Sequence, residues 1–331
     1  MTIVPTELIT DNGAKLESYV LELAHLNNLD FRFIEWLENN NTFCNSLVDR
    51  IVPGKPNNEE LVKLQASLGY EDELLIIAEA FRLWAIEGND NVKKVLAFSV
   101  ADEGVVITPD ITVYKELKLR LLNGTHTLNA CLAFLYGFDL TKQSVNDKTY
   151  MGFMKKLVYE EISNAIPYDI EPAVRNDFAA RVLYRFANPF IDHQWLSITV
   201  QQTAKMKMRV IPLLQKHYER YAVPPIHMTI CFAAYLWFMK SEKKSNGKYV
   251  GKRNGVEYEI KDDEAGYFYE TWQNNSTTEL AATVLRNEAL WGADLAQLPM
   301  FLLSVQERLA EISSVGVVDI VNRLEATKIT A

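Results

Sequence analysis

The sequence predicts a mainly α-helical protein with a small α/β part toward its N-terminus. From Thr112 onward, apolar residues recur at helical spacing over long stretches. Between Leu74 and Thr108, by contrast, Ile, Val, Leu, Phe and Trp come in short bursts that are typical of strands. The chain has 331 residues, 48% of them hydrophobic and 23% charged, which is enough for a large core. We therefore expect two domains, a small strand-containing one over residues 1–110 and a helical one over residues 111–331.

The first domain is expected to alternate between helices and strands. A strand-like start over residues 2–9 precedes the helical patterns, and apolar alternation before Pro53 and Gly54 indicates a strand that runs into a loop. Helices are expected over residues 14–26, 30–39 and 58–68. Three strands of a small sheet are expected within residues 74–86, 95–100 and 104–108.

The second domain is expected to be almost entirely helical. Its helices are expected over residues 112–136, 146–165, 171–187, 195–220, 225–241, 262–273, 276–290 and 294–325. Residues 247–258 interrupt this pattern with strand-like alternation, and Asn254 and Gly255 in their middle are typical of a tight turn. A β-hairpin is therefore predicted among the helices.

Charge and composition disfavour several classes of function. The sequence has 34 basic and 43 acidic residues, a net charge of −9 and a pI near 5.2, which disfavours binding to nucleic acid. No run of about 18 apolar residues occurs, and the first residues lack the pattern of a signal peptide. We therefore expect a cytoplasmic protein without a membrane partner. An anionic small-molecule substrate would need a local cationic pocket.

The cysteines and histidines do not form the pattern of a metal site. Cys44, Cys131 and Cys231 are far apart, and the sequence contains no C-x-x-C pair and no H-E-x-x-H motif. It also contains no G-x-G-x-x-G turn, so the residues themselves do not argue for a dinucleotide. We expect no metal, and these motifs assign no cofactor.

The segment from Lys115 to Asn129 places polar residues in an otherwise apolar helix. At about 100° per residue, Lys118, Asn123 and His126 fall within an arc of roughly 140°, spread along about 12 Å of helix axis. One surface of the helix can therefore present all three side chains. Gly124 lies among them. A glycine inside a helix lowers its stability by about 1 kcal/mol relative to alanine, and this loss is understandable if a ligand or another backbone comes close at that position.

These residue types suit proton transfer to or from a hydroxyl group. A lysine accepts a proton from an alcohol only if its pKa falls well below the usual value of about 10.4, and burial among apolar side chains shifts it in that direction. An asparagine amide stabilises a developing alkoxide without adding a charge. The alternative is structural: Lys118 extends toward solvent, and His126 is a partly buried histidine whose hydrogen bonds are satisfied.

Two further groups of cations are candidates for binding a carboxylate. Arg185 lies at the end of a predicted helix and is followed by Asp192 and His193, and Lys205 lies in a basic stretch with Lys207 and Arg209. Solvated surface charges explain either group equally well. The residues alone leave both roles open.

Two segments of the chain resemble the signatures of a known family. Residues 43–53, which include Asn45, and residues 118–126, which include Asn123, are similar to the two signatures of the polyol-specific long-chain dehydrogenases, the mannitol dehydrogenase family. The similarity spans essentially the whole chain.

The resemblance implies a fold that agrees with the predicted pattern. Residues 111–331 would form the family's helical substrate and catalytic domain. Residues 1–110 would hold a remnant of its nucleotide-binding Rossmann domain and a small strand-containing region. Residues 1 to about 13 look like a late strand and connection of that domain. Because the glycine-rich turn is missing, we expect the isolated chain to bind NAD poorly and to turn over incompletely.

The activity implied is an NAD-dependent, metal-free and reversible reduction of D-tagaturonate to D-altronate in hexuronate breakdown. A sugar acid is favoured because Gly88 follows the stretch Trp84 to Glu87, where mannitol dehydrogenases carry an acidic residue that would repel a carboxylate. The alternatives are fructuronate or mannitol as the substrate of the same chemistry, or a non-catalytic helical binding or assembly module.

The resemblance also implies a role for each candidate residue. Lys118 would be the general acid/base and His126 its orienting partner. Asn45 and Asn123 would be amide donors to the reacting oxygen. The contacts implied for the substrate carboxylate are Arg185 and Lys205.

Overall fold

The computed structural model describes residues 1–245 and 247–326, and the chain folds into two compact units. We call Met1–Lys115 the N-terminal unit and Glu116–Ala331 the helical unit. No helix in the described part of the chain combines the length and the apolar character needed to cross a membrane.

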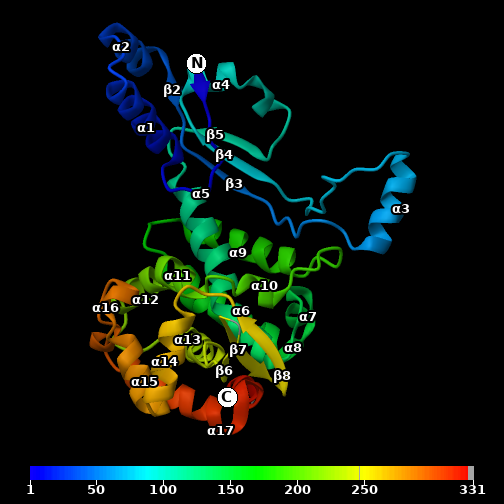
Figure 1. Cartoon of the computed structure of the whole chain (residues 1–331), viewed down its shortest axis with the longest axis vertical. Coiled ribbons are helices and arrows are strands. Elements are labelled where there is room, and N and C mark those ends of the chain that lie inside the picture. The colour runs from blue at the N-terminus through cyan, green and yellow to red at the C-terminus, as the bar shows by residue number, and fades with distance from the viewer. Residues whose placement is uncertain (246, 327–331) are drawn as a thin grey trace. The chain divides into compact units, whose positions relative to one another are not determined.

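The N-terminal unit combines short strands with helices (Figure 1). Its elements are β1 (Thr2–Ile3), α1 (Asn12–Leu26), α2 (Phe31–Asn40), β2 (Thr42–Phe43), β3 (Ser46–Asp49), α3 (Asn58–Leu68), β4 (Leu83–Glu87), α4 (Asp90–Val95), η1 (Ala97–Val100), β5 (Val105–Thr108) and α5 (Thr112–Glu116), the last of which ends at the unit boundary. β1 pairs with β2 in parallel. In the second sheet, β4 lies between antiparallel β3 and parallel β5.

The strand predicted over residues 95–100 is wrong, because this segment is the end of α4 followed by the 3₁₀-helix η1. The pairing of β4 with β5 explains the difference. Two neighbouring parallel strands need a crossover connection, so the chain between them must return along the sheet. The side chain of Asn89 starts that return by accepting hydrogen bonds from the backbone N–H groups of Asn91 and Val92 at the first turn of α4.

The start of α1 is tied to the start of β3 by the buried side chain of Asn12. Its amide nitrogen donates to the carbonyls of Pro5 (3.0 Å) and Ser46 (3.2 Å), and its oxygen accepts from the N–H of Ser46 (2.8 Å). The next residue, Gly13, lies so close to the backbone that an added Cβ would be 2.4 Å from the carbonyl carbon of Cys44. These contacts fix the backbone on both sides of Asn45.

The helical unit is built around a buried central helix. Its elements are η2 (Leu117–Gly124), α6 (Thr125–Tyr136), α7 (Thr141–Asn146), α8 (Lys148–Lys156), η3 (Leu157–Ile162), η4 (Ser163–Ala165), α9 (Pro172–Phe186), α10 (Trp195–Ile198), α11 (Gln202–Lys205), η5 (Met206–Val210), α12 (Ile211–Tyr218), α13 (Ile226–Phe238), β6 (Lys243–Ser245), β7 (Lys248–Arg253), β8 (Val256–Ile260), α14 (Ala265–Asn274), α15 (Thr277–Leu285), α16 (Glu288–Trp291), η6 (Leu295–Gln297) and α17 (Phe301–Ala326). α13 is buried along almost its whole length and packs against α6 and α17 (Figure 1).

The predicted hairpin is confirmed as the antiparallel pair β7 and β8. Asn254 and Gly255 form its turn with φ angles of 50° and 83°, which is the left-handed backbone that these two residue types tolerate best. The sequence pattern missed the third strand of this sheet, β6, which pairs with β7.

Three segments of the predicted helices are π-helical rather than α-helical: η2, η3 and η5. They lie close to one another, because η2 packs against both η3 and η5. The helix predicted over residues 195–220 is also interrupted, since Gln201 has a φ of 54° between α10 and α11. π-helical turns are rare and occur frequently at functional sites, so this cluster directs attention to the residues on it.

Candidate active site

Lys118 and Asn123 both lie on η2, and both are partly buried. In a π-helix each backbone hydrogen bond joins residue i to residue i+5. The two residues are five apart, which is the spacing that one such hydrogen bond spans, so they lie toward the same side of η2. The arc of roughly 140° expected for an α-helix therefore does not apply, because the wider turn reduces the angular offset between Lys118 and Asn123.

Gly124 does not mark the close approach of another backbone. A Cβ added there would lie 3.6 Å from both the Leu119 carbonyl oxygen and the Leu213 side chain, which is ordinary van der Waals contact. We predict that Gly124→Ala leaves the free energy of unfolding unchanged or raises it by up to about 1 kcal/mol, as measured by urea denaturation. Gly13→Ala is the contrasting variant and should lose about 1–3 kcal/mol by overpacking. Equal losses in both variants would contradict this assignment.

His126 lies in the first turn of α6 and is buried, with 6% of its surface exposed. Its ring stacks on Phe186 with a centroid distance of 4.1 Å, and the edges of His193 and Trp195 approach it at 5.1 and 6.2 Å. Burial, followed by the effect of His193 and nearby cations, holds the pKa of His126 well below its usual range. His126 is therefore neutral at pH 7, with one nitrogen that donates and one that accepts.

Three cations gather around this neutral imidazole. The charges of Arg209, Arg185 and Lys205 all contribute to the lowered pKa of His126, which places them near its ring. Burial and the neighbouring Arg209 lower the pKa of Lys205 to about 8, and burial lowers the pKa of Arg209 to about 10. Asp262 is the acidic group that acts on Lys205 in the opposite direction. Positive charge held partly out of water in this way is well suited to bind an anion.

The same region contains buried polar atoms without hydrogen-bond partners among the described residues. They are Thr125 Oγ1, His126 Nε2, His193 Nδ1, Trp195 Nε1, Gln202 Oε1 and Arg209 Nε. Buried polar groups are nearly always paired, so a cluster of unpaired ones indicates a place where water or a ligand binds. Most of these atoms are donors or can be donors, which fits a ligand rich in oxygen. The interpretation of His126 as a satisfied histidine is not supported.

The neutral imidazoles predict a dependence of stability on pH. Burial and the charge of Lys205 lower the pKa of His193 to about 4, whereas an unfolded histidine titrates near 6.5. Below pH 6.5 the unfolded chain therefore binds more protons, and the free energy of unfolding falls between pH 6.5 and 4 by up to about 1.4 kcal/mol per pH unit for each such histidine. Above pH 6.5 this contribution is constant.

Urea denaturation of the wild type and His193→Phe between pH 7 and 4.5 checks this prediction. The variant should show the shallower loss of stability, because it removes one group that gains its proton only on unfolding. Parallel curves for the two proteins would show that His193 is protonated as easily in the folded state as in the unfolded state.

Asn45 lies in the N-terminal unit, at the end of β2 and before β3. Its side-chain oxygen accepts from the N–H of Ala14 (3.1 Å), and its amide nitrogen donates to Glu87 Oε1 (3.3 Å). An amide nitrogen carries two hydrogens, so this bond to Glu87 uses one of them. Asn45 is thus held in a fixed orientation by groups of its own unit.

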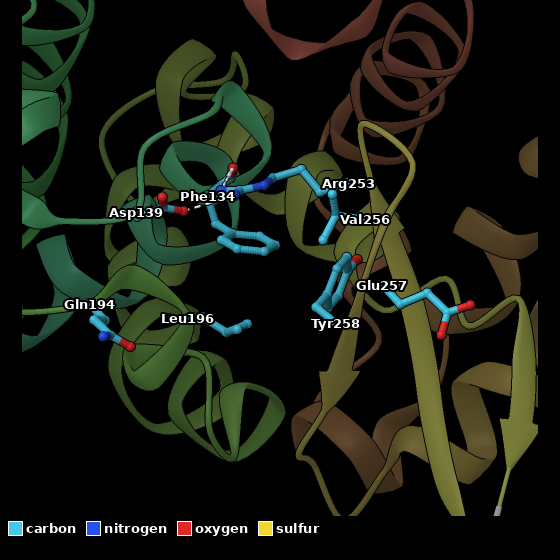
Figure 2. A pocket seen from close by; sticks show the side chains of 8 residues that line it. All are labelled: Phe134, Asp139, Gln194, Leu196, Arg253, Val256, Glu257 and Tyr258. Atoms are coloured by element: carbon cyan, nitrogen blue, oxygen red, sulfur yellow. Dashed lines mark hydrogen bonds and ion pairs between the residues drawn. The ribbon is translucent and has the colours of Figure 1, made fainter.

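A separate pocket of about 300 Å³ lies beside the β7–β8 hairpin, lined by the residues drawn in Figure 2. Its guanidinium group, Arg253, is 2.7 Å from Asp139 and lies over the ring of Phe134. The cation of this pocket is therefore already paired with a carboxylate. The cluster around His126, where Arg209, Arg185 and Lys205 all act on one buried imidazole and several buried polar atoms have no hydrogen-bond partner among the described residues, is the stronger candidate for an anion site.

The described residues include no group of three or more His, Cys, Asp or Glu side chains that could hold a metal ion. For a dinucleotide, the parallel pair β4 and β5 provides strand ends of the kind at which α/β sheets bind nucleotides. The sequence does not contain the glycine-rich turn that would hold the pyrophosphate. The residues present therefore fit part of a nucleotide site, and no pyrophosphate contact is assigned.

Comparison with known proteins shows the family. Residues 110–313 match the mannitol dehydrogenase C-terminal domain, and residues 1–99 match the mannitol dehydrogenase Rossmann domain. The chain belongs to the mannitol dehydrogenase family. It is 35% identical over 318 residues to an altronate oxidoreductase from Bacillus subtilis and 37% identical over 322 residues to one from Yersinia enterocolitica, each match covering 95% of this chain.

Two solved structures share the fold. Mannitol 2-dehydrogenase from Pseudomonas fluorescens, solved with NAD and D-mannitol, has a TM-score of 0.74 at 22% identity, and the match covers 99% of this chain and 63% of that one. A D-sorbitol dehydrogenase has a TM-score of 0.67 at 21% identity, covering 97% of this chain and 62% of that one. This chain spans 62% and 64% of the length of the Bacillus and Yersinia relatives.

The Rossmann match corrects the expectation for the N-terminal part. We expected a remnant in which residues 1 to about 13 represent the Rossmann domain, whereas the match extends over residues 1–99. The sequence pattern did not reveal the larger Rossmann part because its strands are short and separated by predicted loops. A parallel pair of four- and five-residue strands has too little sequence for a recognisable βαβ pattern.

The structure adds residues to the predicted site. Of the sequence candidates, it brings His126, Arg185 and Lys205 together, and places Lys118 and Asn123 on the π-helix that leads into α6. Gln202 was missed as a member of the site, and His193 was named only as part of the helix end that contains Arg185. His193 lies in the connection between α9 and α10, and a single histidine near a helix end carries no sequence signal of what it faces.

Proposed function

We propose that this chain carries the substrate-binding and acid–base residues of an NAD-dependent oxidoreductase that interconverts D-tagaturonate and D-altronate. The observation that carries this proposal is the group of three cations around the neutral, buried His126. A carboxylate in the substrate is attracted by such a group of positive charges, whereas a neutral polyol is not. The altronate oxidoreductase names of the relatives agree with a sugar acid.

The proposed roles are those that the family resemblance implies for each residue. NADH, when bound, supplies the hydride that the keto carbon accepts. Lys118 donates a proton to the keto oxygen in this direction and, once neutral, accepts it in the reverse direction. Asn123, on the same side of η2, donates a hydrogen bond to that oxygen, and Asn45 is assigned the second donor. Neutral His126 orients Lys118, while Arg185 and Lys205 bind the carboxylate.

Activity of two proteins tests the proposal: this chain alone, and this chain joined to the part of the Bacillus subtilis relative that lies outside the match. NADH oxidation is measured with D-tagaturonate, D-fructuronate and D-fructose. The proposal expects D-tagaturonate to be the best substrate of the joined protein. If the joined protein prefers D-fructose, the proposed substrate is a neutral ketose and not a sugar acid. If it prefers D-fructuronate, the substrate is a sugar acid but the other epimer.

Calorimetry with NADH and D-altronate tests the remaining alternative, a helical module without catalytic function. If neither compound binds to the chain or to the joined protein, and neither protein oxidises NADH, the acid–base assignment is withdrawn and the non-catalytic module stands.

A further inference from the structure

We propose that His193 determines the preference for a sugar acid over a neutral sugar, by donating a hydrogen bond from Nδ1 to the substrate carboxylate. This inference rests on the proposed function and names a residue that the resemblance did not assign. It starts from the fact that Nδ1 of His193 is buried and has no partner among the described residues.

The backbone around His193 is held in place, so its ring is presented in a defined position. The His193 carbonyl accepts a hydrogen bond from the N–H of Thr141 (2.9 Å), and the N–H of Trp195 donates to the Asp139 carbonyl (2.8 Å). Lys142 adds an ion pair with Asp192 (2.6 Å). A donor that is already oriented loses little entropy when it binds a ligand.

The ring of His193 faces the site and not the pocket beside the hairpin. Its centroid lies 5.1 Å from that of His126, with the two rings nearly perpendicular at 79°. The next residue, Gln194, lines the separate pocket of Figure 2. Neighbouring residues of this connection thus face different surroundings: His193 lies beside His126, and Gln194 lines the pocket beside the hairpin.

The charges around His193 favour an anionic ligand atom at Nδ1. Burial and, after it, the positive charge of Lys205 lower the pKa of His193 to about 4, so the imidazole is neutral at pH 7. In its Nδ1–H form the ring donates a hydrogen bond without adding a fourth positive charge to the cluster. A carboxylate oxygen that lies between Lys205 and His193 would be bound by charge from one side and by a directed hydrogen bond from the other.

Binding of two ligands to the full chain tests the proposal. D-altronate is compared with D-altritol, in which a hydroxymethyl group replaces the carboxylate, and calorimetry gives the ratio of their affinities. His193→Phe keeps a ring beside His126 but has no nitrogen, whereas His193→Asn keeps an amide near the position of Nδ1. Gln194→Ala is the matched control, since its side chain is exposed and lines the other pocket.

We expect the wild type and Gln194→Ala to prefer altronate equally. His193→Phe should lower that preference by about tenfold or more, as a hydrogen bond to a charged group requires, with little change in altritol binding. His193→Asn should retain most of it. In spectra of the five histidine side chains, altronate should shift the ring nitrogen signals of His193 and leave those of the exposed His25 unchanged.

The outcomes separate this inference from the proposed function. A wild type without preference for altronate would overturn the sugar-acid substrate and the role of His193 together. A wild type that prefers altronate, with an unchanged preference in His193→Phe, would overturn the role of His193 alone. Equal losses for altronate and altritol in both variants would show that His193 only packs against His126, which also overturns the proposal.

Discussion

Replacing Lys118 by methionine should lower the turnover of D-tagaturonate by at least about two orders of magnitude. Methionine keeps the length and the apolar stem of the side chain but has no proton to give. A positioned acid/base group contributes about 10²- to 10⁴-fold to the rate of proton transfer, and this contribution is lost with the amine. NADH oxidation by the joined protein, at saturating substrate, measures the effect.

The matched control for this prediction is Lys115→Met, three residues earlier in the same stretch of helix. Lys115 forms an ion pair with Asp11 at 2.5 Å, and an ion pair with this exposure is worth about 1 kcal/mol or less. Turnover should therefore stay close to that of the wild type. If Lys118→Met also keeps its turnover, or if it loses only substrate affinity, Lys118 is not the acid/base group.

The sequence could reveal Lys118, Asn123 and His126 because they lie within nine residues of one another, and helical spacing alone predicts a shared surface. It could not reveal that this surface lies on a π-helix. The wider π-turn reduces the angle by which five residues overshoot one turn, so Lys118 and Asn123 lie closer to one side of the helix than α-helical geometry predicts.

The remaining site residues could not be found in this way, because their proximity is created by tertiary packing. His193 follows α9, and Arg209 lies on η5, which packs against η2. Neither position has a periodic relation to residues 118–126. The burial that lowers the pKa of Lys205 to about 8 is likewise a property of the packed helices and not of the basic stretch in which it occurs.

In the fold, too, features set by neighbouring residues could be predicted from the sequence, whereas features set by the pairing of distant segments could not. The hairpin at Asn254 and Gly255 was predictable, since two adjacent residues define its turn. The segment over residues 95–100 was not, because its apolar residues suit a strand and only the parallel pairing of β4 with β5 requires a crossover there.

Glu161 is a further residue whose importance only the structure reveals. It lies on η3 and is buried, with 8% of its surface exposed. One carboxylate oxygen accepts from the backbone N–H (2.8 Å) and from Nδ1 (2.7 Å) of His227, and the other accepts from the N–H of Met228 (2.8 Å). Glu161 therefore accepts hydrogen bonds from backbone N–H groups in the first turn of the central helix α13, which have no partner within that helix. Its negative charge also interacts favourably with the positive end of the helix dipole.

Glu161→Ala should destabilise the chain by about 3–5 kcal/mol, because it leaves three buried donors at the start of α13 without their acceptor. For a unit of this size the midpoint of thermal unfolding should fall by roughly 10 °C. Glu161→Gln keeps one accepting oxygen and should lose about half as much. Glu160→Ala, an exposed neighbour on η3, should change stability by less than about 0.5 kcal/mol. A loss in Glu161→Ala no larger than that in Glu160→Ala would show that water replaces the carboxylate at the end of α13.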